Sequence, residues 1–396
     1  MNDWEVTIIR TLEQMEAIRD VWEQMQHNES FAHVDADYDR YLSVLKAADN
    51  SVKPYIILIK QKDHLKTMVI ARTETRQIAC RIGYSTVMKP RMRCLSVVYG
   101  GILGQPDNNV CSILVNELSR ILRSREIDIV FFNHLKTDSC IYQLSKKLPG
   151  ILSRDYFSRV ENHYCMSVPQ NVEEFFRTRS HNHRAKLKRY IRNLEKEFPN
   201  EVEMVTYSNE SDLDKAIRDA SKVSRVTYQY ELGAGFRDTA RTRTLLTTSA
   251  KKGWLRLHIL YIHGEPVAFR NIIKYSNLYI GYGMGHDSKW SKWRVGTVLF
   301  LKILEYICND EDVEIIDFGF GNAEYKDIYS DKQWQEASIY IFAPRFYPTF
   351  INILRTSIAA INSILEYVVK KSGFTNRIKR LWRNRLENKT SQTNDD

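Results

Sequence analysis

The 396-residue chain has few of the residues that mark fibrous, unstructured or disulfide-bonded proteins. Its 16 glycines and 9 prolines are too few for a collagen-like repeat or a long flexible linker. Charged residues interrupt every apolar stretch well before the roughly 20 residues that span a bilayer. We therefore expect no transmembrane helix.

Cysteine is also sparse and is spread along the chain. None of the six cysteines belongs to a C-x-x-C pair, and none has a histidine at the spacing that is typical of zinc sites. We expect reduced, mostly structural thiols and no bound metal. The cysteines are Cys80, Cys94, Cys111, Cys140, Cys165 and Cys308.

The composition is typical of a globular protein, and the chain carries a net positive charge. The chain is 43% hydrophobic and long enough for about two domains of roughly 150 residues each. Its 58 Lys and Arg exceed its 48 Asp and Glu, a net charge of +10 that favours an anionic partner, whether nucleic acid, phospholipid or phosphorylated metabolite. The first ten residues lack the basic start of a signal peptide, so we expect a cytoplasmic protein.

Two parts of the chain have the same order of predicted elements. In each part, apolar strands precede a helix, and the helix leads into a short apolar strand, IDIVFF in one half and VEIIDF in the other. This pattern is typical of a duplicated α/β (α+β) unit, with a mixed twisted sheet flanked by helices in each copy. The predicted elements are 55–59, 66–71, 110–123 and 127–132 in the first half, and 255–262, 266–274, 278–284, 296–308 and 313–318 in the second.

A basic segment separates the two halves. Residues 172–197 contain good helix formers and no glycine or proline, which predicts one long helix. We therefore place four regions along the chain. They are an N-terminal domain at 1–168, a basic linker helix at 169–200, a C-terminal domain at 201–345, and an apolar helix with a basic tail at 346–396.

Glycines in the second half suggest a ligand site. Gly281, Gly283 and Gly285 lie inside a predicted strand, where they indicate a bulge, a tight bend or a closely approaching ligand. A basic loop then leads to Gly296 and a helix, whose exposed backbone N–H groups suit a diphosphate. Gly319 and Gly321 lack the third glycine of a dinucleotide fingerprint, so a Rossmann site is not expected.

The order of these pieces resembles the acetyltransferase-6 family of the GNAT superfamily. This family includes proteins called cellulose-biosynthesis acetyltransferases and is related to the FemAB peptidyl transferases. The resemblance covers about 173–334 clearly, and it implies two tandem GNAT-like domains, of which the first is degenerate and the second catalytic. The residues that carry it are Gly264, Glu265, 267–269, 295–299, Asp317, Phe318, Gly319, Gly321, Tyr325 and Lys326.

The resemblance implies an acyl coenzyme A thioester, such as acetyl-CoA, as co-substrate and no metal. The donor would lie along one strand and the loop that follows it. This loop keeps a single glycine where the superfamily usually has two, which leaves the identity of the acyl donor open. The cofactor-binding residues implied are Tyr282, Gly283 and Met284 in the strand and Arg294, Val295, Gly296 and Thr297 in the loop.

The catalytic residues implied by the resemblance lie at the end of the last strand. An amine acceptor must lose a proton before it attacks, and a carboxylate, Asp317 or Glu324, is suited to take it. Tyr325 and Lys326 would hold the donor or an anionic acceptor; alternatively, the tyrosine is a core ring and the lysine pairs with Asp327.

The acceptor side is expected to include residues from two segments. Arg184 and Lys188 lie on the basic helix, and Tyr230 and Glu231 precede a glycine-rich turn. Aromatic residues at alternating positions also occur in packed strands, which is the simpler interpretation for Tyr230. One active site is expected, in the C-terminal half, with the first half forming walls of the acceptor cleft.

Three functions remain open at this point. The first is acylation of a saccharide or nucleotide-sugar intermediate in cell-surface polysaccharide biosynthesis, with no specific nucleic acid as partner. The second is FemAB-like transfer from an aminoacyl-tRNA, which salt-dependent tRNA binding would favour. The third is a non-catalytic basic protein that binds nucleic acid or a membrane surface, and the basic tail at 370–389 makes a peripheral contact with anionic lipid plausible as an accessory feature.

Overall fold

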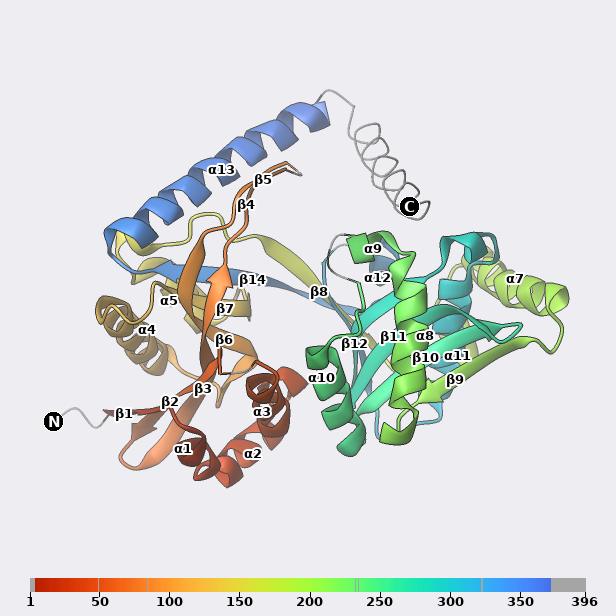
Figure 1. The fold of residues 1–396 in the computed structure, drawn as a ribbon, viewed down its shortest axis with the longest axis horizontal. Helices are drawn as coiled ribbons and strands as arrows, with labels where there is room; N and C mark the ends of the chain where they lie inside the picture. Colours follow the sequence, from red (N-terminus) through yellow and green to blue (C-terminus); the bar gives the residue numbers. More distant parts are fainter. Residues whose placement is uncertain are drawn as a thin grey trace. The chain divides into compact units, whose positions relative to one another are not determined.

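The computed structural model describes residues 4–48, 50–83, 85–231, 233, 235–321 and 323–371. Contacts within the chain divide it into two compact units. The first runs up to Asn162 and resumes at Trp334, and the second runs from His163 to Gln333 (Figure 1). The domain limits expected from the sequence, at 168, 200 and 345, differ from these contact limits and stay predictions.

The first unit contains a six-stranded mixed sheet in the order β1-β2-β3-β6-β7-β14. Neighbouring strands are antiparallel except β6 and β7, which are parallel. The strands are β1 (Trp4–Ile9), β2 (Lys53–Gln61), β3 (His64–Gln77), β6 (Arg91–Leu103), β7 (Ile129–Lys136) and β14 (Lys332–Phe342), with a separate hairpin of β4 (Cys80–Ile82) and β5 (Ser85–Met88).

Alternation along β2 builds two cores on the two faces of this sheet. Tyr55, Ile57 and Ile59 pack with helix α4, whereas Ile56 and Leu58 pack on the other face with residues of α2 and α3. The helices of this unit are α1 (Leu12–Glu16), α2 (Arg19–His27), α3 (Tyr38–Lys46), α4 (Asn108–Arg123), α5 (Cys140–Lys147) and α13 (Phe346–Lys371).

The second unit repeats this plan, with a sheet in the order β8-β13-β12-β11-β10-β9. Again only one pair, β12 and β13, is parallel. The strands are β8 (Val160–Ser167), β9 (Val202–Tyr207), β10 (Leu255–Ile262), β11 (Glu265–Tyr275), β12 (Leu278–His286) and β13 (Ile315–Phe320). The expected α/β class, with mixed sheets flanked by helices, is confirmed.

Helices cover both faces of the second sheet. Helix α11 (Val295–Cys308) is apolar on almost every side and is buried between the sheet and helices α6 (Val172–Arg177) and α7 (His181–Glu197). Helix α8 (Leu213–Arg225) lies on the opposite face, in front of β10 and β11 in Figure 1. The remaining helices are α9 (Tyr228–Glu231), α10 (Ala240–Lys251) and α12 (Glu324–Tyr329).

The single helix expected at 172–197 is two helices in the structure. Helix α6 ends at Arg177, and the Ser180 hydroxyl accepts the backbone N–H of His183 to begin α7. Leu187 and Leu194 of α7 are buried in the core of the second unit. The segment is therefore a packed part of that unit and not an exposed connection.

The end of the chain is partly described. Helix α13 confirms the expected apolar helix after residue 345, and the basic tail beyond residue 371 lies outside the described residues. In the part of the chain that is described, no helix combines the length and the hydrophobicity that crossing a membrane requires.

A buried histidine should make the stability of the second unit depend on pH. His258 on β10 is fully buried; its Nδ1 lies 2.9 Å from the Thr206 hydroxyl, and burial lowers its pKa from 6.5 to about 3. Between these values the unfolded chain binds a proton that the folded chain does not, so stability falls as pH is lowered from 6.5 towards 3. We expect His258→Asn to flatten this dependence in urea unfolding, whereas the exposed control His181→Asn keeps it. Equal slopes for His258→Asn and the wild type would contradict the assignment.

Candidate functional site

The parallel strands β12 and β13 diverge after a short paired segment. Leu278 to Ile280 pair with Ile315 to Asp317, and among the described residues the pairing ends there, although both strands continue. Beyond this point the two strands no longer pair with each other, although β12 still pairs with β11 and β13 with β8. Divergent strands of this kind open a site at the end of a parallel pair.

A bulge on β12 lies at the point of divergence. Asn271 pairs with Gly283 and Ile272 with Gly281, so Tyr282 is the extra residue. Its side chain is 36% exposed. A Cβ on Gly285 would lie 2.7 Å from the Phe269 ring, which explains one of the three glycines by close packing.

The divergence leaves a small hollow of about 50 Å³ between β11, β12 and β13. Asn271 and Arg270 line it from β11, Gly281, Gly283 and Met284 line it from β12, and Tyr325 lines it from α12. The amide oxygen of Asn271 is buried and has no hydrogen-bond partner among the described residues. An unsatisfied buried acceptor of this kind is suited to a ligand N–H group.

Arg270 and Tyr325 set the charge of the hollow. The guanidinium carbon of Arg270 lies 5.0 Å from the Phe300 ring centre and 5.5 Å from that of Tyr325. Burial raises the pKa of Tyr325, although the charge of Arg270 opposes this rise. The tyrosine is therefore a protonated hydrogen-bond donor at neutral pH.

The start of α11 is free of an acidic cap. Arg294 occupies the cap position with φ 53°, and no side chain accepts the first N–H groups of the helix. Lys289 and Lys292 lie in the short 3₁₀ helix Ser288–Trp293 that precedes it. Val295 is buried in the core, while Gly296 and Thr297 form the first turn. Positive residues and unbonded N–H groups at a helix start favour an anion.

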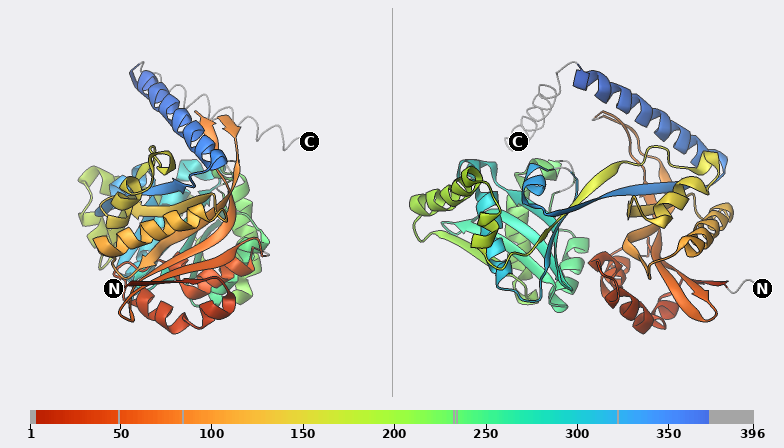
Figure 2. Two further views of the ribbon diagram at one scale, coloured as in Figure 1. Left: turned by 90° about the vertical axis from the view of Figure 1, so that its left-hand side faces the viewer. Right: turned by 180° about the vertical axis from the view of Figure 1, so that it is seen from behind.

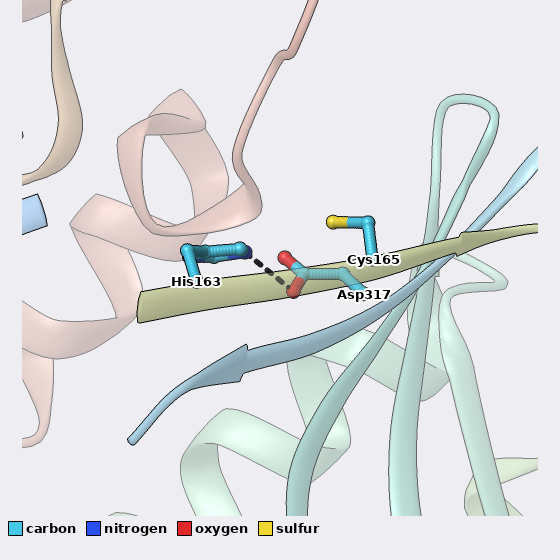
Figure 3. Close-up of side chains that lie close together, drawn as sticks. All are labelled: His163, Cys165 and Asp317. Carbon is cyan, nitrogen blue, oxygen red and sulfur yellow. Dashed lines mark hydrogen bonds and ion pairs between the residues drawn. The ribbon is translucent and has the colours of Figure 1, made fainter. Parts of the chain in front are cut away.

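Asp317 is part of a buried polar cluster next to the hollow. His163 and Cys165 are two residues apart on β8, so they lie on one face, and Cys165 is the cross-strand partner of Asp317 (Figure 3). Nε2 of His163 donates to Oδ1 of Asp317 over 2.7 Å, and the Gly319 N–H donates to the same oxygen over 2.6 Å. All three side chains are at most 2% exposed. Asp317 is therefore held by neighbouring groups instead of facing open solvent.

The same cluster has the donor types that zinc prefers. Within the described residues, the ligand atoms of His163, Cys165 and Asp317 lie within 4.8 Å of one another. However, Nε2 and Oδ1 are already joined by a short hydrogen bond. The arrangement fits a hydrogen-bonded network, and the absence of a metal stays an expectation from the sequence.

Helix α12 carries the other residues expected to be catalytic. Glu324 begins the helix and is exposed. Lys326 is 8% exposed, and its Nζ donates to the backbone oxygen of Phe320 over 2.7 Å. The lysine thus links α12 to the end of β13 by a hydrogen bond.

The residues expected on the acceptor side are separate from the hollow and from one another. Lys188 on α7 pairs with Glu173 at 2.9 Å, and Arg184 lies half-buried on the same helix. Tyr230 belongs to the short helix α9, where Arg237 lies 4.1 Å from its ring centre, and Glu231 is exposed. None of the four lines the hollow between the described strands.

Four residues of the site were missed by sequence reasoning. Arg270 and Asn271 interrupt an apolar strand, AFRNII, and a charge inside such a run is a signal that was available. His163 and Cys165 share one face of β8 because they are two residues apart, but their partner is 154 residues away along the chain. Only strand pairing brings that partner close.

The first unit contains a larger cavity, of about 450 Å³, beside its own parallel pair. Strand β6 pairs with β7 only from Cys94 to Val97, and β6 then bulges strongly, since Ala71 faces Val97 and Val69 faces Ile102. The cavity opens at this bulge. The sequence had indicated no comparable site in this half.

The cavity of the first unit has polar and aromatic walls but an acidic helix start. Glu336 is 2% exposed and accepts hydrogen bonds from the Tyr99 hydroxyl at 3.1 Å and from the Trp334 indole at 2.6 Å. The carboxylate of Asp107 caps α4 by accepting the Val110 N–H at 2.8 Å. A carboxylate at this position disfavours a diphosphate.

Comparison with known families identifies part of the chain. Residues 181–327 match the model of the acetyltransferase (GNAT) domain family. A search of curated proteins found no match. The match confirms the expected resemblance of this part of the chain to the GNAT superfamily.

Solved structures share the fold at low identity. FemX aligns with a TM-score of 0.56 and 7% identity over 85% of this chain and 97% of its own. A conserved protein of unknown function from Bacteroides thetaiotaomicron gives 0.54 and 12%, over 85% and 100%. A tandem GNAT protein from the clavulanic acid biosynthesis pathway gives 0.52 and 9%, over 86% and 100%. The expected tandem GNAT-like fold is confirmed.

Replacing the buried carboxylate should weaken the second unit. Asp317→Asn removes the charge that His163 and the Gly319 N–H bind, so we expect a loss of about 1–3 kcal/mol in the free energy of unfolding. Urea unfolding followed by tryptophan fluorescence measures it. Asp312→Asn is the matched control, because the Asp312 side chain is 81% exposed and its pair with Lys274 contributes little. Equal stability of Asp317→Asn and the wild type would show that the cluster is not structural.

Proposed function

Because residues 181–327 form a domain of the acetyltransferase (GNAT) family, we propose that the protein transfers an acyl group from a coenzyme A thioester to an amino or hydroxyl group of a saccharide or nucleotide-sugar. The observation that carries the proposal is the divergence of β12 and β13 directly before an uncapped, basic helix start. We further propose a role in cell-surface polysaccharide biosynthesis and a cytoplasmic location.

The donor is proposed to follow β12 into the start of α11. The diphosphate of coenzyme A would accept hydrogen bonds from the N–H groups of Val295 and Gly296, beside the cations of Lys292 and Arg294. The unsatisfied oxygen of Asn271 is suited to an amide N–H of the pantetheine arm. These residues offer hydrogen-bond partners for the two kinds of polar group in an acyl coenzyme A, the diphosphate at one end and the amides along the pantetheine arm.

The reaction is a substitution at the thioester carbonyl. The nitrogen or oxygen of the acceptor attacks the carbonyl carbon, the new C–N or C–O bond forms, and the C–S bond breaks. The oxyanion needs donors, and the backbone N–H groups released by the bulge at Tyr282 are suited to this role. The protonated hydroxyl of Tyr325 lines the same hollow and would give its proton to the departing thiolate.

The proton of the acceptor requires a base. Glu324 is the exposed carboxylate at the start of α12, one residue from Tyr325, and we propose it for this role. Asp317 is proposed as a positioning residue because its carboxylate binds His163 and the Gly319 N–H. Lys326 would act similarly, since it binds the Phe320 carbonyl and so fixes the turn between β13 and α12.

The cavity of the first unit is proposed to bind a small polar molecule such as a saccharide. Its volume of about 450 Å³ lies within the range of small-molecule sites, and its walls combine carboxylate, histidine, amide and aromatic groups. Glu336 is suited to bind an amino or hydroxyl group. Arg184 and Lys188 are proposed for the phosphates of a nucleotide-sugar, and Tyr230 and Glu231 for its polar groups.

A second candidate is transfer from an aminoacyl-tRNA. It is favoured by the exposed basic residues Lys186, Arg189 and Arg192 on α7, which form a patch suited to a polyanion. The likeness to FemX supports the fold alone. Strongly salt-dependent tRNA binding without binding of coenzyme A would favour this candidate over the first.

Donor binding is the direct test. In isothermal titration with acetyl-CoA we expect micromolar affinity for the wild type. Gly296→Asp should lower this affinity by at least about tenfold, because its carboxylate would repel the diphosphate at the proposed anion site. A Cβ at Gly296 meets only His286, at 3.5 Å, so the effect is one of charge. Gly150→Asp is the control, since it adds the same charge at an open position of the first unit. No binding by the wild type at millimolar acetyl-CoA would refute the donor assignment.

The cavity of the first unit is tested by a change without loss of volume. Glu336→Gln should weaken the binding of an amino sugar or nucleotide-sugar, measured by isothermal titration, by roughly 10-fold or more, since it removes the charge that Tyr99 and Trp334 hold in place. The affinity for acetyl-CoA should stay unchanged. Glu126→Gln, at an exposed pair with Arg10, is the control. An unaltered dissociation constant in Glu336→Gln would rule out this cavity as a saccharide site, and acetyl-CoA binding without acetylation of any sugar would refute the saccharide class.

A further inference from the structure

Helix α13 is firmly attached to the first unit along one side. Asn352 donates from Nδ2 to the backbone oxygens of Leu152 and Arg154, and Arg355 pairs with Asp155 at 2.6 Å. Farther along, Asn362 accepts the Gly83 N–H at 2.8 Å and donates to the Arg81 carbonyl at 2.7 Å. These bonds fix which face of the helix points away from the unit.

The opposite side of α13 is an exposed apolar stripe. Its residues are separated by four, three, eight and three positions, which places them on one face of a helix, with the exposed Ser357 inside the longest interval. The buried residues Pro348, Ile351 and Ile358 lie on the other face. The stripe consists of Phe346, Phe350, Ile353, Ile361 and Ile364, which are 89%, 51%, 53%, 43% and 63% exposed.

The hairpin β4–β5 adds apolar and positive groups beside the helix. Asn362 binds this hairpin, and Figure 2 shows β4 and β5 next to the blue helix α13. Ile82 and Val87 are exposed on it. From Ile78 to Arg93 the sequence contains no acidic residue, whereas Arg81, Lys89 and Arg91 are exposed cations.

Charged residues are few along α13. From Phe346 to Leu365 the sequence has one charged residue, Arg355, which pairs with Asp155, and Glu366 follows; Arg345, just before the helix, pairs with Asp128. In the sequence that follows, eight Lys and Arg at positions 370–389 accompany the single acidic residue Glu387. An apolar stripe with aromatic residues, flanked by cations and without carboxylates, is the pattern of a helix that lies in a membrane interface.

We propose that the α13 stripe, defined as Phe346, Phe350, Ile353, Ile361 and Ile364, binds the surface of an anionic lipid bilayer. The helix lies parallel to the surface with these side chains among the acyl chains near the headgroups, while the cations of the β4–β5 hairpin contact lipid phosphates. Anionic lipid is favoured over a second copy of the chain because the hairpin beside the stripe carries exposed cations and no carboxylate, so the hairpins of two copies would repel each other.

This proposal does not depend on acyl transfer. Vesicle binding and acetyl-CoA binding are measured separately, so failure of one leaves the other intact. If both hold, the stripe brings the enzyme to the membrane surface, where an acceptor attached to a lipid would be met.

The test is sedimentation of the full chain with phosphatidylcholine vesicles, with and without 30% phosphatidylglycerol. We expect binding to the anionic vesicles that weakens with salt. The partition coefficient of Ile364→Asp should be lower than that of the wild type by at least about fivefold, because the substitution places a carboxylate in the apolar stripe. Ser363→Asp is the matched control. It is the adjacent exposed position off the stripe, and we expect it to change partitioning by less than about twofold.

Three results would overturn the proposal. The first is a wild type that sediments with neither kind of vesicle, and the second is an Ile364→Asp variant that partitions like the wild type. The third is a wild type that is dimeric in sedimentation velocity while Ile364→Asp is monomeric, which would assign the stripe to a second copy. Circular dichroism and thermal unfolding of both variants verify that each is folded.

Discussion

The pairing of β12 with β13 ends after three residues, and the features that the second unit offers to a ligand depend on this early end. If the two strands stayed paired, their backbone N–H groups would be consumed by the ladder and no hollow would lie between them. The bulge at Tyr282 reinforces the divergence, because an extra residue increases the local twist of β12. Asp317 is the last residue of the pairing on β13, and its hydrogen bonds to His163 and Gly319 anchor that strand to β8 and to its own turn where the support of β12 is lost.

The two units show how one strand plan can support different chemistry. Both have a single parallel pair that separates beyond a bulge, and both place a helix after the first strand of that pair. The difference lies in the first residues of the helix. The Asp107 carboxylate accepts the Val110 N–H at the start of α4, whereas no side chain caps the start of α11 at Arg294. Since the N-terminal end of a helix carries partial positive charge, the first arrangement repels a diphosphate and the second attracts one.

Local sequence patterns predicted most of the fold. The apolar runs of β2, β10 and β11 and the apolar spacing of α4 are properties of contiguous residues, so their positions and the repeat of the two halves could be inferred. The basic loop before α11 was predicted for the same reason, and donor binding at 294–297 stays a proposal that rests on the family resemblance. The break between α6 and α7 was missed because Ser180 acts as a helix cap inside a run of good helix formers, where composition alone favours continuation. The cavity of the first unit was missed because its size follows from the separation of β6 and β7, which no residue in either strand encodes alone.

Strands that are distant in the sequence explain why both sites could not be predicted from contiguous residues. The sixth strand of the first sheet is β14, which follows the second unit in the chain, and the sixth strand of the second sheet is β8, at the boundary where that unit begins. Each of these strands brings a buried polar residue to a site: β14 brings Glu336 to the cavity of the first unit, and β8 brings His163 to Asp317. Both residues lie outside the 181–327 match to the GNAT domain family. A chain cut near residue 168 would leave the first sheet without β14 and the second without β8, so neither site is complete in a separate half. Because β8 and β14 complete the two sites, function must be measured on the whole chain and not on the GNAT domain alone.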